Sequence, residues 1–155
     1  MKKIVFVLIL TLIIALTTGC GQNERYIQLF QENGRTTYID KESVTYDKET
    51  KVATYWAKQD FDEKARINAA SKWADNGGVG ANPYLETQYI LSLHKVRLDS
   101  KYICFVELNY MDKNGKAVLR IPAPVSNNWV AFNSDDKADK AQQAVLKIIK
   151  DQGKL

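Results

Sequence analysis

The C-terminal twenty residues constrain the fold of this chain more than any other stretch. Five apolar side chains recur there at helical spacing: Ala138, Ala141, Val145, Ile148 and Ile149. Ser134 is the predicted N-cap of this helix, and Gly153 is its predicted C-cap. The lysines and glutamines fall largely outside the apolar stripe, so the helix is one-sided. A one-sided helix has to bury its stripe, and the rest of the chain must supply a matching apolar layer.

That layer is predicted to be an antiparallel sheet. Short apolar and β-branched runs alternate with turn residues, and Asn33-Gly34 and Asn114-Gly115 are the clearest hairpin turns. Strands are expected at residues 26–30, 36–39, 43–46, 52–57, 89–94, 102–111 and 117–121. The predicted fold class is α+β: an antiparallel sheet of about six to seven strands with the C-terminal helix packed on one face.

The middle of the chain changes from strand to helix pattern. Ala65, Ala69 and Trp73 recur at helical spacing between Asp62 and Asn76, and Asp60 or Asp62 is the expected cap. The small residues of Gly77 to Pro83 then predict a loop. A second helix is therefore expected mid-chain, on the same side of the sheet as the first.

The N-terminus has the pattern of an export signal. Lys2 and Lys3 precede the apolar run Ile4–Leu16, which is too short for a comfortable membrane span. The following Thr17-Thr18-Gly19-Cys20 resembles the lipobox of bacterial lipoproteins, in which the cysteine is acylated and the chain is cut just before it. A plain secretory signal and an uncleaved signal anchor are the alternatives.

This pattern divides the chain into three parts. Residues 1–19 are predicted to be a signal peptide cleaved between Gly19 and Cys20, residues 20–25 a lipidated cysteine and tether, and residues 26–155 one domain. The expected location is extracytoplasmic: the protein is anchored to the membrane by lipid on Cys20, at the cell envelope or cell surface.

Composition limits the partners and the cysteine chemistry. The 155 residues carry a formal net charge of +4, part of which belongs to Lys2 and Lys3. No Lys/Arg cluster appears, so nucleic acid is not an expected partner. With Cys20 acylated, Cys104 has no partner for an intrachain disulfide and is expected to be a buried, inert thiol. An intermolecular disulfide through Cys104 is the alternative.

No motif predicts an enzyme. His94 is the only histidine, and no metal site or nucleophile motif includes it. Gly77-Gly78-Val79-Gly80 lacks the Gly-Lys-Ser/Thr of a phosphate-binding loop. The carboxylates are scattered among turns: Asp40, Glu42, Asp47, Glu49, Asp60, Asp62, Glu63, Glu86 and Glu107. We expect no catalytic residues, no metal and no cofactor.

Aromatic residues are the candidates for a binding surface. Strand alternation places Tyr55 and Trp56 on opposite faces, so one of them is expected at the surface. The predicted binding residues are Trp56, Trp73, Tyr84 and Trp129.

The order of elements carries a family resemblance. Tyr38-Ile39-Asp40-Lys41-Glu42-Ser43-Val44 precedes a strand with Trp56. The strand 101–104, the hairpin at 112–115 and the Pro-containing segment 121–126 then lead into the final helix. Over residues 26–150 this order is similar to the surface-adhesin protein E-like family of bacterial lipoproteins, although residues 62–83 match poorly.

The resemblance implies a curved antiparallel sheet with the C-terminal helix held against it, and adhesion to host matrix proteins. It also implies a disulfide between a strand cysteine, matched by Cys104, and a cysteine in the helix. The helix around Val145 to Ile149 has no cysteine, so packing alone has to hold it.

Three hypotheses follow for the function. The leading one is a lipid-anchored envelope protein that presents a non-enzymatic binding domain to extracellular or envelope proteins, a surface adhesin among them. The second is an accessory lipoprotein that binds a small ligand or envelope component in a pocket lined by Trp73 and Tyr84, beneath the Gly77–Pro83 loop. The third, an enzyme built on His94 and two carboxylates, has the least support.

Overall fold

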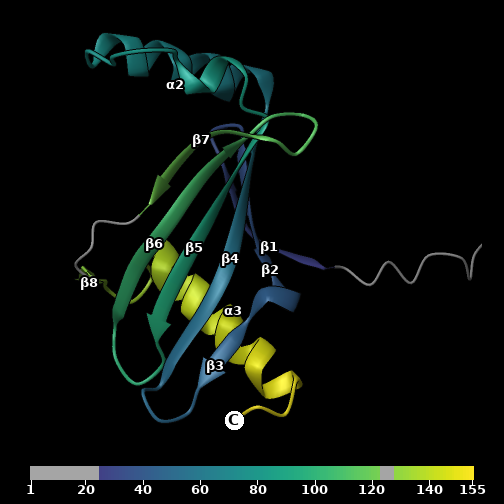
Figure 1. Cartoon of the computed structure of the whole chain (residues 1–155). Helices are drawn as coiled ribbons and strands as arrows, with labels where there is room; N and C mark the ends of the chain where they lie inside the picture. Colours follow the sequence, from purple (N-terminus) through teal and green to yellow (C-terminus); the bar gives the residue numbers. More distant parts are fainter. Residues whose placement is uncertain (1–24, 123–127) are drawn as a thin grey trace, which may run out of the picture.

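The computed structural model describes residues 25–122 and 128–155. The strands are β1 (Tyr26–Glu32), β2 (Arg35–Asp40), β3 (Thr45–Asp47), β4 (Val52–Phe61), β5 (Tyr89–Arg97), β6 (Tyr102–Met111), β7 (Ala117–Pro122) and β8 (Trp129–Ala131). They form one eight-stranded antiparallel sheet in the order β1–β2–β4–β5–β6–β7 (Figure 1). Short β3 pairs with β4, and short β8 pairs with β6 beyond the end of β7.

The helices are α2 (Glu63–Asp75) and α3 (Lys137–Asp151), with two short 3₁₀ turns, η1 (Lys41–Ser43) and η2 (Pro83–Leu85). The predicted α+β class is confirmed, and so are both predicted helices. The sheet has one strand more than expected because three-residue β8 is too short to produce an alternating pattern. In the described part of the chain, no helix is long and apolar enough to cross a membrane.

The first hairpin is fixed by the sequence of its turn. Asn33 and Gly34 have φ angles of 49° and 73°, the left-handed values that a two-residue hairpin requires. A Cβ on Gly34 would lie 2.3 Å from a carboxylate oxygen of Asp62, so the turn also needs glycine for space. The amide of Asp62 donates to the Gly34 carbonyl at 2.8 Å, and Oδ1 of Asp62 caps α2 by accepting from the Ala65 amide at 2.7 Å. The hairpin tip therefore positions the start of α2.

Helix α3 buries its apolar stripe against one face of the sheet. Val145 and Ile149 are completely buried among side chains from β2, β4 and β5, including Ile39, Tyr55 and Val96. Gln142 is also buried, and its amide donates to the backbone carbonyls of Arg97 and Ser100. The apolar contacts hold the helix against the sheet, and the glutamine satisfies backbone groups beyond the end of β5.

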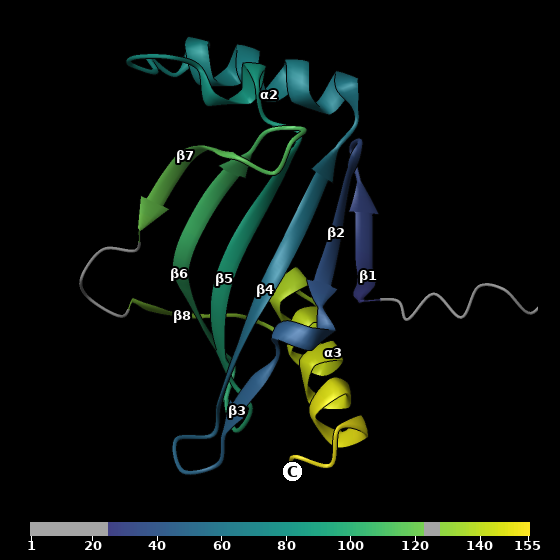
Figure 2. The ribbon, with the colours of Figure 1, turned by 45° about the vertical axis from the view of Figure 1, so that its right-hand side comes forward.

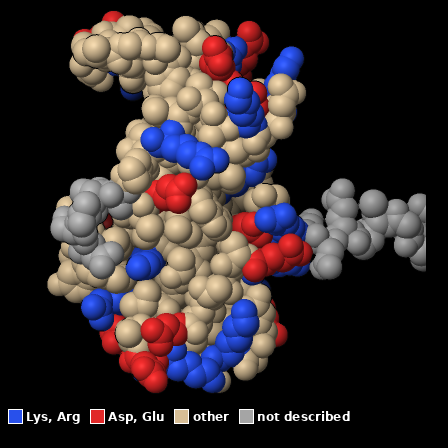
Figure 3. Space-filling view, in the orientation of Figure 1, with Lys and Arg blue, Asp and Glu red and all other residues tan. Residues whose placement is uncertain are grey.

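No helix of the described residues covers the other face of the sheet. Along β4, Ala53, Tyr55 and Ala57 are buried on the α3 side, while Trp56 and Lys58 point the opposite way. Figures 1 and 3 view the molecule from this uncovered side, with α3 behind the sheet, and Figure 3 shows a broad surface with few charged groups at its centre. We call this side the open face.

Helix α2 is where the predicted packing is wrong. It lies across the ends of the strands rather than beside α3 on the sheet (Figure 2). Its buried residues are three alanines, Ala65, Ala69 and Ala70, which offer too little apolar area to cover a sheet face. Ala65 instead joins a small cluster with Phe61, Ile90 and Tyr110.

The start of α3 also differs from the prediction. The helix begins after Asp136, because Asp135 has a φ of 74° and interrupts the helix between Ser134 and Lys137. Oδ2 of Asp136 accepts a hydrogen bond from the Asn133 amide, so this side chain closes the turn before the helix. Ser134 is not the cap, because it lies before the left-handed residue.

Truncating α3 at its centre tests how much the stripe contributes. Ile149→Ala removes a fully buried side chain and is expected to lower the free energy of unfolding by about 3 kcal/mol. Lys147→Ala, on the exposed side of the same helix, is the control and is expected to change it by less than about 0.5 kcal/mol. Urea denaturation followed by circular dichroism measures both, and equal effects would contradict the packing.

Candidate functional site

The structure separates the four predicted binding residues into two pairs. Trp56 and Trp129 both lie on the open face, with β5 and β6 between their strands. Trp73 and Tyr84 lie together in a cavity beneath α2. The prediction therefore joined residues of two separate surfaces.

A lysine clamped by aromatic rings lies on the open face near β1. Nζ of Lys58 is 5.5 Å from the ring centre of Tyr26 and 4.9 Å from that of Tyr89. It also forms an ion pair of 2.9 Å with Asp60. The rings and the carboxylate together hold the ammonium group in place. Alternation could have revealed this lysine, because it lies two residues from Trp56 in the same strand.

The β6–β8 side of the open face carries more basic residues than acidic ones, with Glu107 engaged by Asn109. The Arg97 guanidinium lies 5.0 Å from the ring centre of Trp129. The register places Lys95, Arg97 and Arg120 on this face, and no acidic side chain in the described part of the chain pairs with them. Here the sequence patterns did not single out the arginines, because they come from strands that only the sheet order brings together.

Asn109 is a buried polar residue on the same face. Its Nδ2 donates to Glu107 at 2.8 Å, but its buried Oδ1 has no hydrogen-bond partner within the described part of the chain. A buried acceptor without a partner is unusual in a folded protein, because it forfeits its hydrogen bond to water. Asn109 is thus an unsatisfied polar group beneath the open face.

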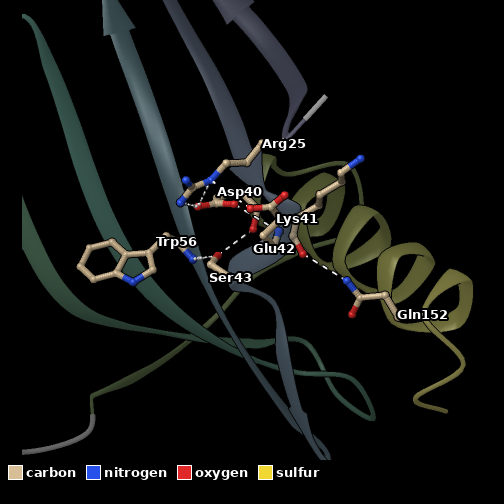
Figure 4. A network of polar contacts seen from close by, with 7 residues as sticks. All are labelled: Arg25, Asp40, Lys41, Glu42, Ser43, Trp56 and Gln152. Carbon is tan, nitrogen blue, oxygen red and sulfur yellow. Dashed lines mark hydrogen bonds and ion pairs between the residues drawn. The ribbon is translucent and has the colours of Figure 1, made fainter. Parts of the chain in front are cut away.

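The segment that carries most of the family resemblance makes a structural corner. Asp40, the buried last residue of β2, accepts hydrogen bonds from Arg25 Nη2 at 2.6 Å and from the Glu42 amide at 3.1 Å (Figure 4). Ser43 donates to the Asp40 carbonyl at 2.7 Å. The aspartate and serine thus fold the 3₁₀ turn η1 and hold the first described residue of the chain.

The same corner joins three parts of the molecule. Oγ of Ser43 accepts from the backbone amide of Trp56 in β4 at 2.9 Å, and the Lys41 carbonyl accepts from Gln152 just beyond α3 at 3.2 Å (Figure 4). Every polar group of the segment in this network serves packing or capping. The motif is therefore a feature of the fold, and it identifies no binding residue.

His94 is placed for packing. Its ring stacks on Tyr55 at 5.4 Å between centres and meets Phe105 edge-on at 5.2 Å, and Nε2 bonds with Ser92 Oγ at 2.8 Å. Burial lowers its pKa from 6.5 to about 4. No carboxylate of the described part of the chain contacts the ring, and residues 25–122 and 128–155 contain no cluster of His, Cys, Asp and Glu that could hold a metal.

Cys104 is buried, as expected. The register sets it against Lys95 and Trp129 on the open face, whereas neighbouring Ile103 packs into the core beneath α3. The match between Cys104 and a strand cysteine bonded to the helix is therefore wrong in geometry. A cysteine placed in α3 would lie on the opposite side of the sheet.

A groove runs beneath α2, on the side of the sheet that α3 only partly covers. Two cavities of about 390 and 370 Å³ share Arg35 and Lys72 in their walls. The first continues to Gln59, Asn68 and Lys137, and the second to Trp73, Gly78 and Tyr84. We call this pair of cavities the α2 groove. The pocket lined by Trp73 and Tyr84 that the sequence suggested is present.

These features define a class of fold: an open antiparallel sheet, backed by a C-terminal helix and bare on its other face. No protein-family model and no curated protein matches the sequence. Solved structures do match, and among them are those of protein E from Haemophilus influenzae.

Crystal form II of protein E superposes with a TM-score of 0.53 at 17% identity, covering 83% of this chain and 90% of that chain. Another protein E structure gives 0.52 at 18% identity, covering 84% and 88%, and the selenomethionine form gives 0.52 at 18% identity, covering 79% and 86%. The chain therefore has the protein E fold, which confirms the family resemblance at the level of the fold.

Gly19 and Cys20, on which the predicted cleavage and lipid depend, lie outside the described residues. The predicted signal, anchor and tether stay predictions. The described chain begins at Arg25, next to Asp40 in the corner.

Acidification tests the burial of His94. An unfolded chain protonates this histidine near pH 6.5, whereas the folded chain resists protonation until about pH 4. Its contribution to stability is therefore complete above the unfolded pKa and is lost as the pH falls toward 4. Since the ring is only partly exposed, we expect a loss of roughly 2 kcal/mol that His94→Phe does not show.

The measurement is urea denaturation of both proteins near neutral pH and near the folded pKa. Carboxylates with lowered pKa values, such as Asp47 and Asp112, destabilise both proteins equally in acid. The difference between the two proteins isolates His94, and the same acid sensitivity in both would contradict its burial as a neutral ring.

Proposed function

We propose that this chain is a lipid-anchored protein of the bacterial envelope that binds an acidic partner protein through the open face of its sheet. In this proposal it acts as an adhesin or envelope-binding module, without enzymatic activity. The export signal pattern, the lipobox-like Thr17 to Cys20 and the protein E fold support the location.

The open face is the observation that carries the proposal. It combines aromatic rings, Trp56 and Trp129, with basic groups that have no acidic partner among the described residues, Lys95, Arg97 and Arg120. Partly buried aromatic and arginine side chains are the residues that contribute most to protein interfaces. The excess of basic groups favours a partner surface rich in Asp and Glu.

The polar groups of this face favour a specific contact over nonspecific adhesion. Lys58 is held by Tyr26, Tyr89 and Asp60, so it is ordered before a partner arrives. Ordering a side chain beforehand reduces the entropy lost on binding.

Lipidation has a direct test in the mass of the mature protein. The full chain, produced in a bacterial host, is expected to begin at Cys20 and to carry a diacylglyceryl group, because Gly19-Cys20 follows the apolar run directly. Cys20→Ser is expected to abolish the added mass and the partition into detergent, and Cys104→Ser is expected to change neither. An uncut precursor, or an unmodified Cys20, would refute the anchor.

Binding is tested with the detergent-solubilised full chain against a panel of purified matrix and envelope proteins. We expect saturable binding to an acidic member of the panel that weakens with added salt. Trp56→Ala and Trp129→Ala are each expected to weaken it by about tenfold, the effect of losing a central aromatic contact.

Trp73→Ala is the matched control, because it removes the same side chain from a different surface. Binding that responds equally to all three substitutions, or no saturable binding, would contradict a role for the open face.

A further inference from the structure

The walls of the α2 groove contain more basic side chains than acidic ones. Arg35, Lys72 and Lys137 line it, and among the described residues Glu32 is the only acidic one in its walls. Glu32 is bonded to Lys137, and the charges of Lys137 and Arg35 both help to lower the pKa of that carboxyl. Within the described part of the chain, Lys72 has no ion pair or hydrogen bond, and the Arg35 guanidinium lies 5.1 Å from the ring centre of Phe61 without an ion pair of its own. Three cations face one carboxylate, so the groove has positive charge left for an anionic ligand.

The other walls supply amide groups. Gln59 and Asn68 line the same cavity, and Gln59 is fixed by donating to Thr37 Oγ1 at 3.2 Å. Amides can donate to a carboxylate or phosphate oxygen and can also accept from a hydroxyl group. This combination suits a ligand that carries both an acidic group and hydroxyl groups.

Aromatic rings form the end of the groove near the loop after α2. The Gly78 amide donates to the Trp73 carbonyl at 3.0 Å, and a Cβ on Gly78 would lie 2.3 Å from the indole ring. Only glycine allows the loop to approach the indole this closely. Tyr84 is held by Tyr110, with ring centres 5.3 Å apart and the two hydroxyls 3.2 Å apart. Both rings are thus positioned by their neighbours.

We infer that the α2 groove binds a small molecule that joins an acidic group to a ring, such as a sugar acid or sugar phosphate. The acidic group pairs with Arg35 and Lys72, and the ring packs on Trp73 or Tyr84. The two cavities together have the size usual for a small-molecule site. This site is separate from the open face, so it does not depend on the proposed protein partner.

The three tryptophans give a site-specific measurement. The full chain, labelled with ¹⁵N in tryptophan and kept in mild detergent, is titrated with glucuronate, glucose 6-phosphate, glucose and inorganic phosphate at constant ionic strength. We expect glucuronate or glucose 6-phosphate to shift the Trp73 indole signal saturably and to leave those of Trp56 and Trp129 in place. The sugar that binds tells whether the acid is a carboxylate or a phosphate.

Lys72→Gln is expected to weaken this binding by about tenfold, because it removes one charge-assisted contact. Lys147→Gln, the same change on the exposed side of α3, is expected to bind as the unaltered chain does. Unchanged Trp56 and Trp129 signals in both variants show that each is folded.

Three results would overturn the inference: no saturable Trp73 shift with either acidic sugar, an equal response to glucose or to phosphate alone, or equal weakening in both variants. A saturable shift of Trp56 or Trp129 alone would also overturn it, because the ligand would then bind the open face. The tests of the two surfaces thus fail independently.

Discussion

The burial of the α3 stripe is the interaction on which the rest of the structure depends. Val145 and Ile149 are fully enclosed by β2, β4 and β5, and this contact makes one side of the sheet a core. An antiparallel sheet can tolerate water on its other side, so a single long amphipathic helix is enough for such a fold. Between Arg25 and Pro122 and from Asn128 onward, no second helix is able to cover the other face, because the buried residues of α2 are alanines.

Both candidate surfaces exist because the described helices cover only part of the sheet. The open face keeps Trp56 and Trp129 at the surface, and the displacement of α2 to the strand ends leaves the α2 groove on the opposite side of the sheet, next to the start of α3. The corner at Asp40 and Ser43 compensates on the covered side, where it ties β2, β4 and the end of α3 together without a disulfide. The most recognisable segment of the sequence thus stabilises the fold and leaves binding to other residues.

Local patterns predicted the elements well, and they failed where distant residues decide the outcome. Strand alternation correctly placed Tyr55 and Trp56 on opposite faces, and the Asn33-Gly34 turn was correct because its φ angles are a local requirement. The helix cap was wrong because the left-handed Asp135 interrupts the turn. The match of Cys104 to a position facing the helix was wrong. Side chains alternate between the two faces along β6, and the pairing of β6 with β5 and β8 shows that Cys104 lies on the face away from α3.

By itself, the sequence determined the two helices, the hairpins and the α+β class, since each depends on residues close in the chain. Only the tertiary structure decided which residues act together. It divided Trp56 and Trp129 from Trp73 and Tyr84, and it brought Arg35 of β2 to Lys72 of α2. The physical reason is that a binding surface consists of side chains from separate strands and helices, and their proximity is set by sheet order and packing.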